Sequence, residues 1–435
     1  MTTQKSTRLS LTSAIVINLT IMLGIGVFIN TVNLARMNGS CGFMGYLIVA
    51  TLLAPLIITM AQLIARIPEG GFYAYGRTDL SPLCGFISAW TYWCAKLASA
   101  SLMIHISITT LQYLFPILAI INPLVLDIAV LGLFSVAFSR NIKTSTHLLY
   151  SFLGLKLIPL LCVLLGGILM YSRTYVLWSW GDCSLEGLLN TIPLVLYVFT
   201  GFEASCSLSA HIENPAHNGP RAIMYSFVAI LSLVTLYQLL FTIIIPAPLL
   251  GAQESYRDAF KLLLQVLGAH GQLLYYSSVI VLSAIALSAL GGAYGILFSN
   301  QWNLYTLALK NHLPYSHTLT ALNKYGIPLH CTFAQIAGCI LFLWYTTGTQ
   351  IALQQIGALG SAVAYTISVI GALRSSSQKS RIIPACALAS CILLLGSCVR
   401  NFLINGPGIF YIFALIIIIG TLIAYYRQKY STIAY

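Results

Sequence analysis

Two stretches decide which fold this chain of 435 residues can adopt: Leu19-Thr-Ile-Met-Leu-Gly-Ile-Gly-Val-Phe-Ile29 and Leu194-Val-Leu-Tyr-Val-Phe-Thr-Gly-Phe-Glu-Ala204. Each is an apolar run with glycine near its middle. A helix that unwinds inside hydrocarbon frees N–H and C=O groups, which are tolerated only where they line a polar cavity. Glycine-interrupted spans at matching positions of two halves indicate the binding site of a secondary transporter. We therefore expect a mid-membrane site for a small zwitterion or ion.

The composition places the chain in a lipid bilayer. Hydrophobic residues make up 58% of it and charged residues only 7%, whereas a soluble domain carries roughly 25% charged residues. The loops between apolar runs are short, so no large soluble domain fits. After the polar residues 1–10, the first apolar run is too long for a signal-peptide core, and we interpret it as a retained span.

About 20 apolar residues cross the hydrocarbon core, and this length divides the chain into twelve expected spans. They lie near 11–35, 42–66, 83–110, 116–138, 147–171, 187–210, 223–249, 272–298, 329–347, 350–373, 384–403 and 407–426. An even number of spans puts both termini on one side of the membrane.

The basic residues indicate which side that is. The formal net charge of +12 could suggest nucleic-acid binding, but lysine and arginine also retain loops in the cytoplasm during insertion. With cytoplasmic termini, few of the 21 basic residues fall in outer loops, namely Arg36, Arg173, Arg257, Lys261 and Arg400. We expect a multi-pass protein of the cell (inner) membrane with cytoplasmic termini, and no nucleic-acid partner.

The 11 cysteines are mostly inside expected spans and form no Cys-x-x-Cys. We interpret them as apolar packing residues rather than as a disulfide or metal framework. No cofactor and no metal site are expected.

Several motifs occur in the order found in one transporter superfamily. They are Gly24-Ile-Gly-Val-Phe28, Pro68-Glu-Gly-Gly-Phe-Tyr-Ala-Tyr75, Phe199-Thr-Gly-Phe-Glu203 with Glu213-Asn-Pro215, and Asn311-His-Leu-Pro314 with Asn323-Lys-Tyr-Gly-Ile-Pro328. Through them the chain resembles the amino acid–polyamine–organocation (APC) superfamily, in particular its amino acid permeases.

The resemblance implies an all-α polytopic membrane protein of twelve transmembrane helices, with the leucine-transporter-type fold of two inverted five-helix repeats plus two helices. The transport core would be residues 11–373, with repeats 11–171 and 187–373. Spans 11 and 12 would occupy 384–426, where the fold often dimerises. Residues 1–10 and 427–435 would be cytoplasmic tails.

The first break predicts recognition of a carboxylate. N–H groups freed at Gly24, Ile25 and Gly26 would point at an anion, helped by the positive end of the following half-helix. The resemblance implies that these residues hold an amino acid's α-carboxylate, with Met22 beside them. The alternative is a glycine pair that only permits close helix packing.

The second break predicts the complementary contact. The resemblance implies that carbonyl groups around Thr200 and Gly201 accept from the substrate's ammonium, and that Tyr197 covers the site. Tyr197 could instead be a packing or lipid-facing aromatic. Glu203 is a functional candidate because a carboxylate this deep is costly unless paired or protonated. It could carry a proton or latch a gate, or it could make only a structural hydrogen bond.

Lys156 lies in an expected span, where apolar surroundings favour loss of its proton. The resemblance implies proton coupling, because proton-coupled members carry a lysine where sodium-coupled relatives hold sodium. The alternative is a static charge that braces span 1 against span 8. We expect Lys96 to pack or to pair with Asp127 rather than contact substrate. His105 stands alone in span 3, and we expect a satisfied buried histidine rather than a proton relay.

These observations predict a secondary active transporter of an amino acid, with protons as a second partner and a homodimer as an open question. One alternative is an exchanger of the arginine–agmatine type, for which a polyamine could be substrate. A more distant alternative is a transporter-like sensor. The sequence Gly291-Gly-Ala293 stands where the arginine exchanger has a stacking tryptophan, which favours a neutral substrate. Motifs of intramembrane enzymes are absent from the sequence, so we do not expect an enzyme.

Overall fold

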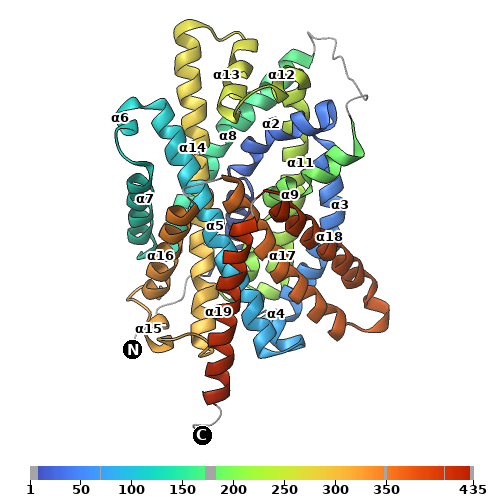
Figure 1. Cartoon of the computed structure of the whole chain (residues 1–435), viewed down its shortest axis with the longest axis vertical. Helices are drawn as coiled ribbons and strands as arrows, with labels where there is room; N and C mark the ends of the chain where they lie inside the picture. Colours follow the sequence, from blue (N-terminus) through green and yellow to red (C-terminus); the bar gives the residue numbers. More distant parts are fainter. Residues whose placement is uncertain are drawn as a thin grey trace.

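The computed structural model describes residues 8–68, 70–140, 142–171, 183–346, 350–405 and 407–431, and these residues form helices with no strand beyond one isolated bridge. Outside them lie most of the expected tails (1–7 and 432–435), Arg173 of an expected outer loop and Glu69 of one motif. Figure 1 shows α13 at one end of the molecule, and α4, α15 and the last turns of α19 at the other. These are called the α13 end and the α4 end below.

The first part of the chain alternates long helices with short ones. Its elements are α1 (Leu11–Met22), α2 (Gly26–Asn38), α3 (Met44–Arg66), α4 (Gly71–Asp79), α5 (Pro82–Leu114), α6 (Pro116–Ala119), α7 (Pro123–Phe138), α8 (Ile142–Tyr171), α9 (Leu185–Phe199) and α10 (Ala204–Ser207).

The second part has the same character. Its elements are α11 (Pro215–Ile244), α12 (Ala247–Gly251), α13 (Tyr256–Val266), α14 (Gly271–Leu309), α15 (Ser316–Leu319), α16 (Leu329–Thr346), α17 (Gln350–Ser375), α18 (Ile382–Asn405) and α19 (Pro407–Ser431).

Serine residues start several of the long helices. The hydroxyl groups of Ser10, Ser81 and Ser184 each accept a hydrogen bond from the N–H group three residues later, at the start of α1, α5 and α9. Such a cap satisfies one of the free N–H groups of the first turn. The starts of these three helices are therefore determined by the residues next to them in the sequence.

The described residues contain ten helices long and apolar enough to cross a membrane, or eleven if the bent pair α1–α2 counts as one span. The expected fourth span, 116–138, is the exception. It divides into α6 and α7 because Pro123 has no N–H to continue a helix, and Asn122 caps the new start. The resulting α7 has 16 residues, so the structure does not confirm the count of twelve.

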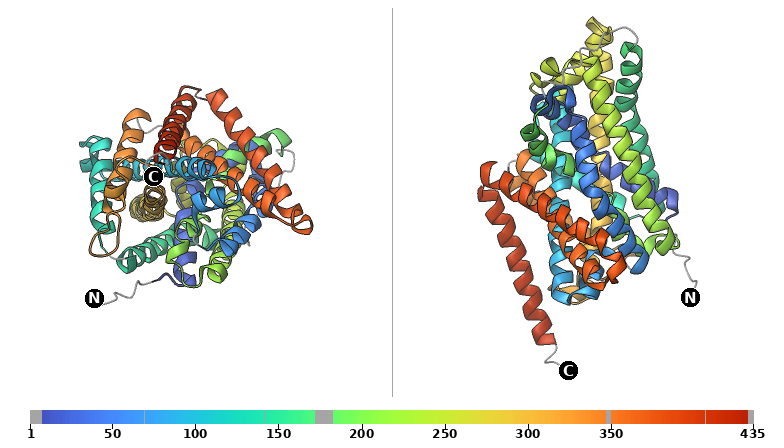
Figure 2. Two further views of the ribbon diagram at one scale, coloured as in Figure 1. Left: turned by 90° about the horizontal axis from the view of Figure 1, so that it is seen from below. Right: turned by 90° about the vertical axis from the view of Figure 1, so that its right-hand side faces the viewer.

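The two longest helices form the centre of the bundle. These are α5, with 33 residues, and α14, with 39 residues. They pack against each other, and α17 also packs against α5. Figure 2 shows α18 and α19 at the edge of the molecule, where Leu415 and Ile418 are more than half exposed. Apolar side chains on this outer surface indicate contact with lipid.

A short main-chain contact fastens the segment before α1 to the segment after α10. Leu9 N–H donates to the His211 carbonyl at 2.7 Å, and Glu213 N–H donates to the Leu9 carbonyl at 2.9 Å. The side chain of Asn18 in α1 accepts from both the N–H and the hydroxyl of Ser205 in α10. The halves of the two broken spans nearer the α4 end are thus joined.

Candidate functional site

The first broken span unwinds between Met22, which ends α1, and Gly26, which begins α2. The two halves are bent by 45°. Among the described residues, no backbone carbonyl accepts a hydrogen bond from the N–H groups of Gly24, Ile25 or Gly26. Since these groups lie at the positive end of α2, the break offers the donors that a carboxylate needs.

The second broken span unwinds after Phe199, where α9 ends, and resumes as α10 at Ala204. Gly201 has φ +127°, which other residues rarely adopt. In the part of the chain that the structure covers, no backbone N–H donates to the carbonyl oxygens of Val198, Phe199 or Thr200. This break therefore offers acceptors, the groups that an ammonium needs.

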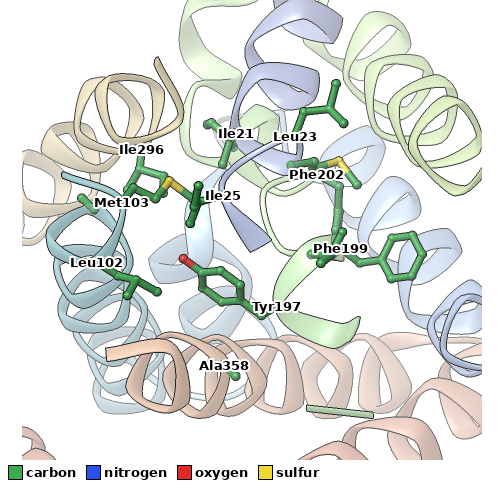
Figure 3. Packing of buried hydrophobic residues seen from close by; sticks show 14 of the residues in the cluster. Ile21, Leu23, Ile25, Leu102, Met103, Tyr197, Phe199, Phe202, Ile296 and Ala358 are labelled. Atoms are coloured by element: carbon green, nitrogen blue, oxygen red, sulfur yellow. The ribbon is translucent and has the colours of Figure 1, made fainter. Parts of the chain in front are cut away.

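The two breaks lie against each other. A Cβ atom added to Gly26 would lie 2.9 Å from Cδ1 of Tyr197, and one added to Gly201 would lie 3.1 Å from Cγ of Met22. Figure 3 shows Ile25 and Tyr197 next to each other, with Met103 of α5 close by. Glycine at both positions is what permits this close approach.

The structure thus brings the residues predicted for the substrate site into one region, and it buries them there. They are all buried: Met22, Gly24, Ile25, Gly26, Tyr197, Thr200 and Gly201. Tyr197 is buried rather than lipid-facing. Its hydroxyl, close to Ser99, has no hydrogen-bond partner among the described residues.

Glu203 lies at the centre of a buried polar group beside the second break. Its Oε1 atom is 2.7 Å from the ammonium of Lys96 and accepts a hydrogen bond from the Tyr92 hydroxyl at 3.1 Å. Its Oε2 atom accepts from Gly201 N–H at 2.7 Å. Both charged side chains are almost fully buried, with 3% and 0% exposure for Lys96 and Glu203. The carboxylate therefore ties the broken segment to α5.

This ion pair corrects the expected partner of Lys96. Asp127 of α7 is instead paired with His105 of α5, with 2.8 Å between Oδ2 and Nδ1, so His105 has the partner expected of a satisfied histidine. The sequence gives no measure of which of two distant carboxylates a lysine meets, because that depends on how the helices pack. Tyr92 was missed, although it lies four residues before Lys96 and therefore on the same helix face.

Lys156 of α8 is fully buried and lies between the first break and α14. Its ammonium donates to the carbonyl oxygens of Leu23 at 2.6 Å and Ser288 at 2.5 Å, and to the Ser288 hydroxyl at 3.0 Å. An ammonium has three donors and no acceptor, so these contacts use all three. Lys156 holds Leu23, the first residue after α1, against α14.

A cavity of about 1050 Å³ lies beyond the two breaks, toward the α13 end. Ile29 and Val32 of α2 line it together with Leu194 of α9. Three charged residues, Glu254, Arg257 and Arg400, also line it. Its wall begins within one turn of Gly26 and Tyr197, so this cavity leads toward the buried site without including it.

Cys41 and Cys183 form a disulfide, with 5.7 Å between their Cα atoms. This corrects the expectation that the cysteines serve only in packing, although six of the free ones are buried. Cys41 follows α2, whose Arg36 side chain binds the Gly251 carbonyl at the end of α12. Cys183 precedes α9. Both cysteines lie in expected outer loops rather than in spans. That shared location is the feature of the sequence from which a disulfide between them could have been predicted.

The motif after α3 forms the short helix α4, whose Tyr73 contacts the loop after α14. His312 Nε2 is 2.8 Å from the Tyr73 hydroxyl, and the His312 side chain is buried. Burial, together with the positive charge of Arg77, lowers the pKa of His312 to about 4. The motif thus closes the α4 end with a neutral histidine.

No three His, Cys, Asp or Glu side chains in the described ranges are grouped as a metal site requires.

Comparison with known proteins agrees with this architecture. The sequence profile of the amino acid permease family matches residues 9–432, and the chain therefore belongs to the amino acid permease family. It is 26% identical over 395 residues to an uncharacterised transporter of Mycobacterium bovis, covering 89% of this chain and 85% of that protein.

Two further relatives match smaller parts of the chain. A Legionella pneumophila transporter is 24% identical over 296 residues, which is 66% of this chain and 62% of that protein. The arginine/ornithine antiporter of Latilactobacillus sakei is 26% identical over 252 residues, which is 54% of this chain and 52% of that protein. The chain is thus a multi-pass membrane protein of a transporter family, and its relatives carry transporter names.

Proposed function

We propose that this chain is a secondary active transporter that moves an amino acid across the cytoplasmic membrane by alternating access, coupled to protons. The observation that carries the proposal is the pair of adjoining breaks. Free N–H groups at Gly24–Gly26 would bind the substrate's carboxylate, and free carbonyl groups near Thr200 would bind its ammonium. Backbone groups would hold the part shared by all amino acids, while side chains of the surrounding helices would select the rest.

Substrate would enter through the cavity at the α13 end. Tyr197 packs against Gly26, three residues after Leu194 of the cavity wall, and in this proposal it would act as a gate that moves to admit a ligand. At the other side of the breaks, the ion pair of Glu203 with Lys96 would form part of the closed inner passage. Opening one side while the other stays closed is alternating access.

Proton coupling would act through Lys156, with Glu203 as a second candidate. A protonated Lys156 supplies three donors, which match its three contacts with Leu23 and Ser288. A neutral amine has one hydrogen fewer and would release one of these contacts. Loss of the proton would therefore loosen α1 from α14 at the first break.

The disulfide supports the proposed orientation. Disulfides form and persist in oxidising compartments outside the cytoplasm, and Cys41–Cys183 joins the segments at the α13 end. That end would face outward, which agrees with the basic residues predicted for the cytoplasmic side. The proposal includes cytoplasmic termini, a count of twelve spans with α1–α2 and α7 each spanning once, and inverted repeats at 11–171 and 187–373.

Exchange of one amino acid for another is the second candidate function. It is favoured by the relative named as an arginine/ornithine antiporter. Uptake assays distinguish the two: a symporter accumulates substrate in empty proteoliposomes on a pH gradient, whereas an exchanger requires amino acid inside.

The proposed function is tested by binding. Purified protein is heated with each amino acid and polyamine in turn, and at least one amino acid should raise its melting temperature. Gly26→Leu should abolish that shift because the new side chain would fill the space occupied by Tyr197. The proposal is wrong if no amino acid stabilises the wild-type protein, or if Gly26→Leu binds as the wild type does.

A further inference from the structure

One face of α5 lies alongside both breaks. Lys96, Ser99 and Met103 lie three and four residues apart, so their side chains share a face of this helix. Met103 packs against Gly24 of the first break, and Ser99 is close to Tyr197. Lys96 is paired with Glu203 beside the second break. A substrate held by the two breaks would therefore lie along this face, with Lys96 at one end.

Glu203 is the one carboxylate beside the breaks among the described residues, and it is not free. Lys96, Tyr92 and Gly201 N–H each contact it. The other acidic side chains in described ion pairs, Asp79 and Asp127, are paired with Arg66 and His105 away from the breaks. A cationic substrate side chain would find no unpaired carboxylate here and would lie near the Lys96 ammonium.

The same pair disfavours an acidic substrate side chain. A second carboxylate that approached Lys96 would also approach Glu203, whose charge already occupies that ammonium. Because both partners are buried, water screens neither charge, and a like charge brought close is strongly disfavoured. The pair therefore presents each class of charged side chain with a repelling group, which is a recognised way to reject unwanted ligands.

We propose that Lys96, through its ion pair with Glu203, is a specificity-determining residue that restricts the site to amino acids with uncharged side chains. This inference rests on the proposed amino-acid transport and deepens it by naming the substrate class. It separates this chain from its relative named for arginine and ornithine, because the ion pair rejects a side chain that carries a second positive charge.

The test compares amino acids of equal length that differ in charge. Norvaline is ornithine without its terminal ammonium, and glutamine is an uncharged counterpart of glutamate. Affinities are measured on the purified full-length protein by competition against the best ligand of the thermal screen. The wild-type protein should bind norvaline at least about tenfold more tightly than ornithine, and glutamine at least about tenfold more tightly than glutamate.

Variants of the pair then reverse the preference. Lys96→Gln leaves the Glu203 carboxylate without its cation and should improve ornithine binding relative to norvaline by about tenfold or more. Glu203→Gln leaves Lys96 unpaired and should improve glutamate binding relative to glutamine in the same way. Lys96→Arg keeps the charge and should keep the wild-type ratios. A lysine that served only in packing would change affinities without changing these ratios.

The outcomes separate the two proposals. If the wild-type protein binds no amino acid, the transport function fails. If it binds norvaline and ornithine equally, the function stands and the charge selection is overturned. Unchanged ratios in a folded Lys96→Gln protein also overturn it. Should Lys96→Gln not fold, the wild-type ratios and the glutamate preference of Glu203→Gln decide the question.

Discussion

The ammonium of Lys156 lies 2.6 Å from the carbonyl oxygen of Leu23, the residue at which α1 loses its helical geometry. A free carbonyl at a helix end inside a membrane needs a donor. Lys156 provides it from another helix and joins Leu23 to Ser288 of α14. The unwound segment is thereby held in place by a group whose number of donors depends on its protonation.

Replacing Lys156 with alanine should abolish uptake driven by a pH gradient, because the amine whose proton is proposed to hold α1 against α14 would be absent. Substrate binding should remain measurable, since the free N–H groups at the break are still present. Radiolabelled uptake into proteoliposomes, with and without the gradient, measures the first effect, and thermal shift measures the second. Unchanged pH-driven uptake would exclude Lys156 from coupling.

Enlarging Gly26 should eliminate binding through a local clash. The Cβ of Gly26→Leu would meet the Tyr197 ring at 2.9 Å, which is closer than packed carbon atoms lie. Gly154→Leu is the matched control, because a Cβ added to Gly154 in α8 meets no atom within 4 Å. Isothermal titration should show no heat for Gly26→Leu and wild-type affinity for Gly154→Leu. Equal loss in both would point to a general effect of leucine.

Acid should destabilise the α4 end through His312. The pKa of this buried histidine is lowered from 6.5 to about 4, so the unfolded chain binds its proton more readily than the folded one. The stability from the neutral ring is complete above pH 6.5 and is lost as pH falls toward 4, by about 1.4 kcal/mol per pH unit. Melting temperatures in detergent across this range measure the slope.

The variant His312→Gln removes that titration and should flatten the slope between pH 6.5 and pH 4. Tyr73→Phe removes the hydrogen bond but leaves the histidine, so it should lower the melting temperature while retaining most of the slope. A wild-type slope in His312→Gln would assign the acid sensitivity to another group.

Removing the disulfide should lower stability. The cross-link joins residues 142 positions apart, and loss of a native disulfide typically costs about 2–5 kcal/mol. Cys41→Ser and Cys183→Ser should lower the melting temperature equally, and the double variant should lower it no further. Cys386→Ser, at an exposed free cysteine, is the control. Unequal single effects would argue against the pair.

The sequence was sufficient for features that depend on neighbouring residues. Glycine in the middle of an apolar run predicted both broken spans, and serine residues before apolar runs mark where long helices start. Lys156 was singled out because a lysine in an apolar span needs a partner. Each of these inferences concerns a single helix and its own composition.

Features that depend on packing between helices could not be predicted from the residues of a single helix. Lys96 pairs with Glu203, 107 positions away in sequence, and Cys41 pairs with Cys183 across most of the first half of the chain. The shortened α7 was also missed, because the apolar residues of the expected span 116–138 continue on both sides of Pro123, at which α7 begins. Which partner a side chain meets is fixed only when the helices assemble.

The main-chain contact of Leu9 with His211 and Glu213 has a counterpart at the opposite end of the two broken spans. There, Asn30 of α2 donates to the Leu194 carbonyl of α9 at 2.8 Å, and the disulfide joins the same pair of segments. The broken spans therefore form two coupled arms, α1 with α10 and α2 with α9. Among the described residues, the only helix interruptions between the arms are the few residues around Gly24 and Gly201, so a ligand seated there would touch the junction of both arms.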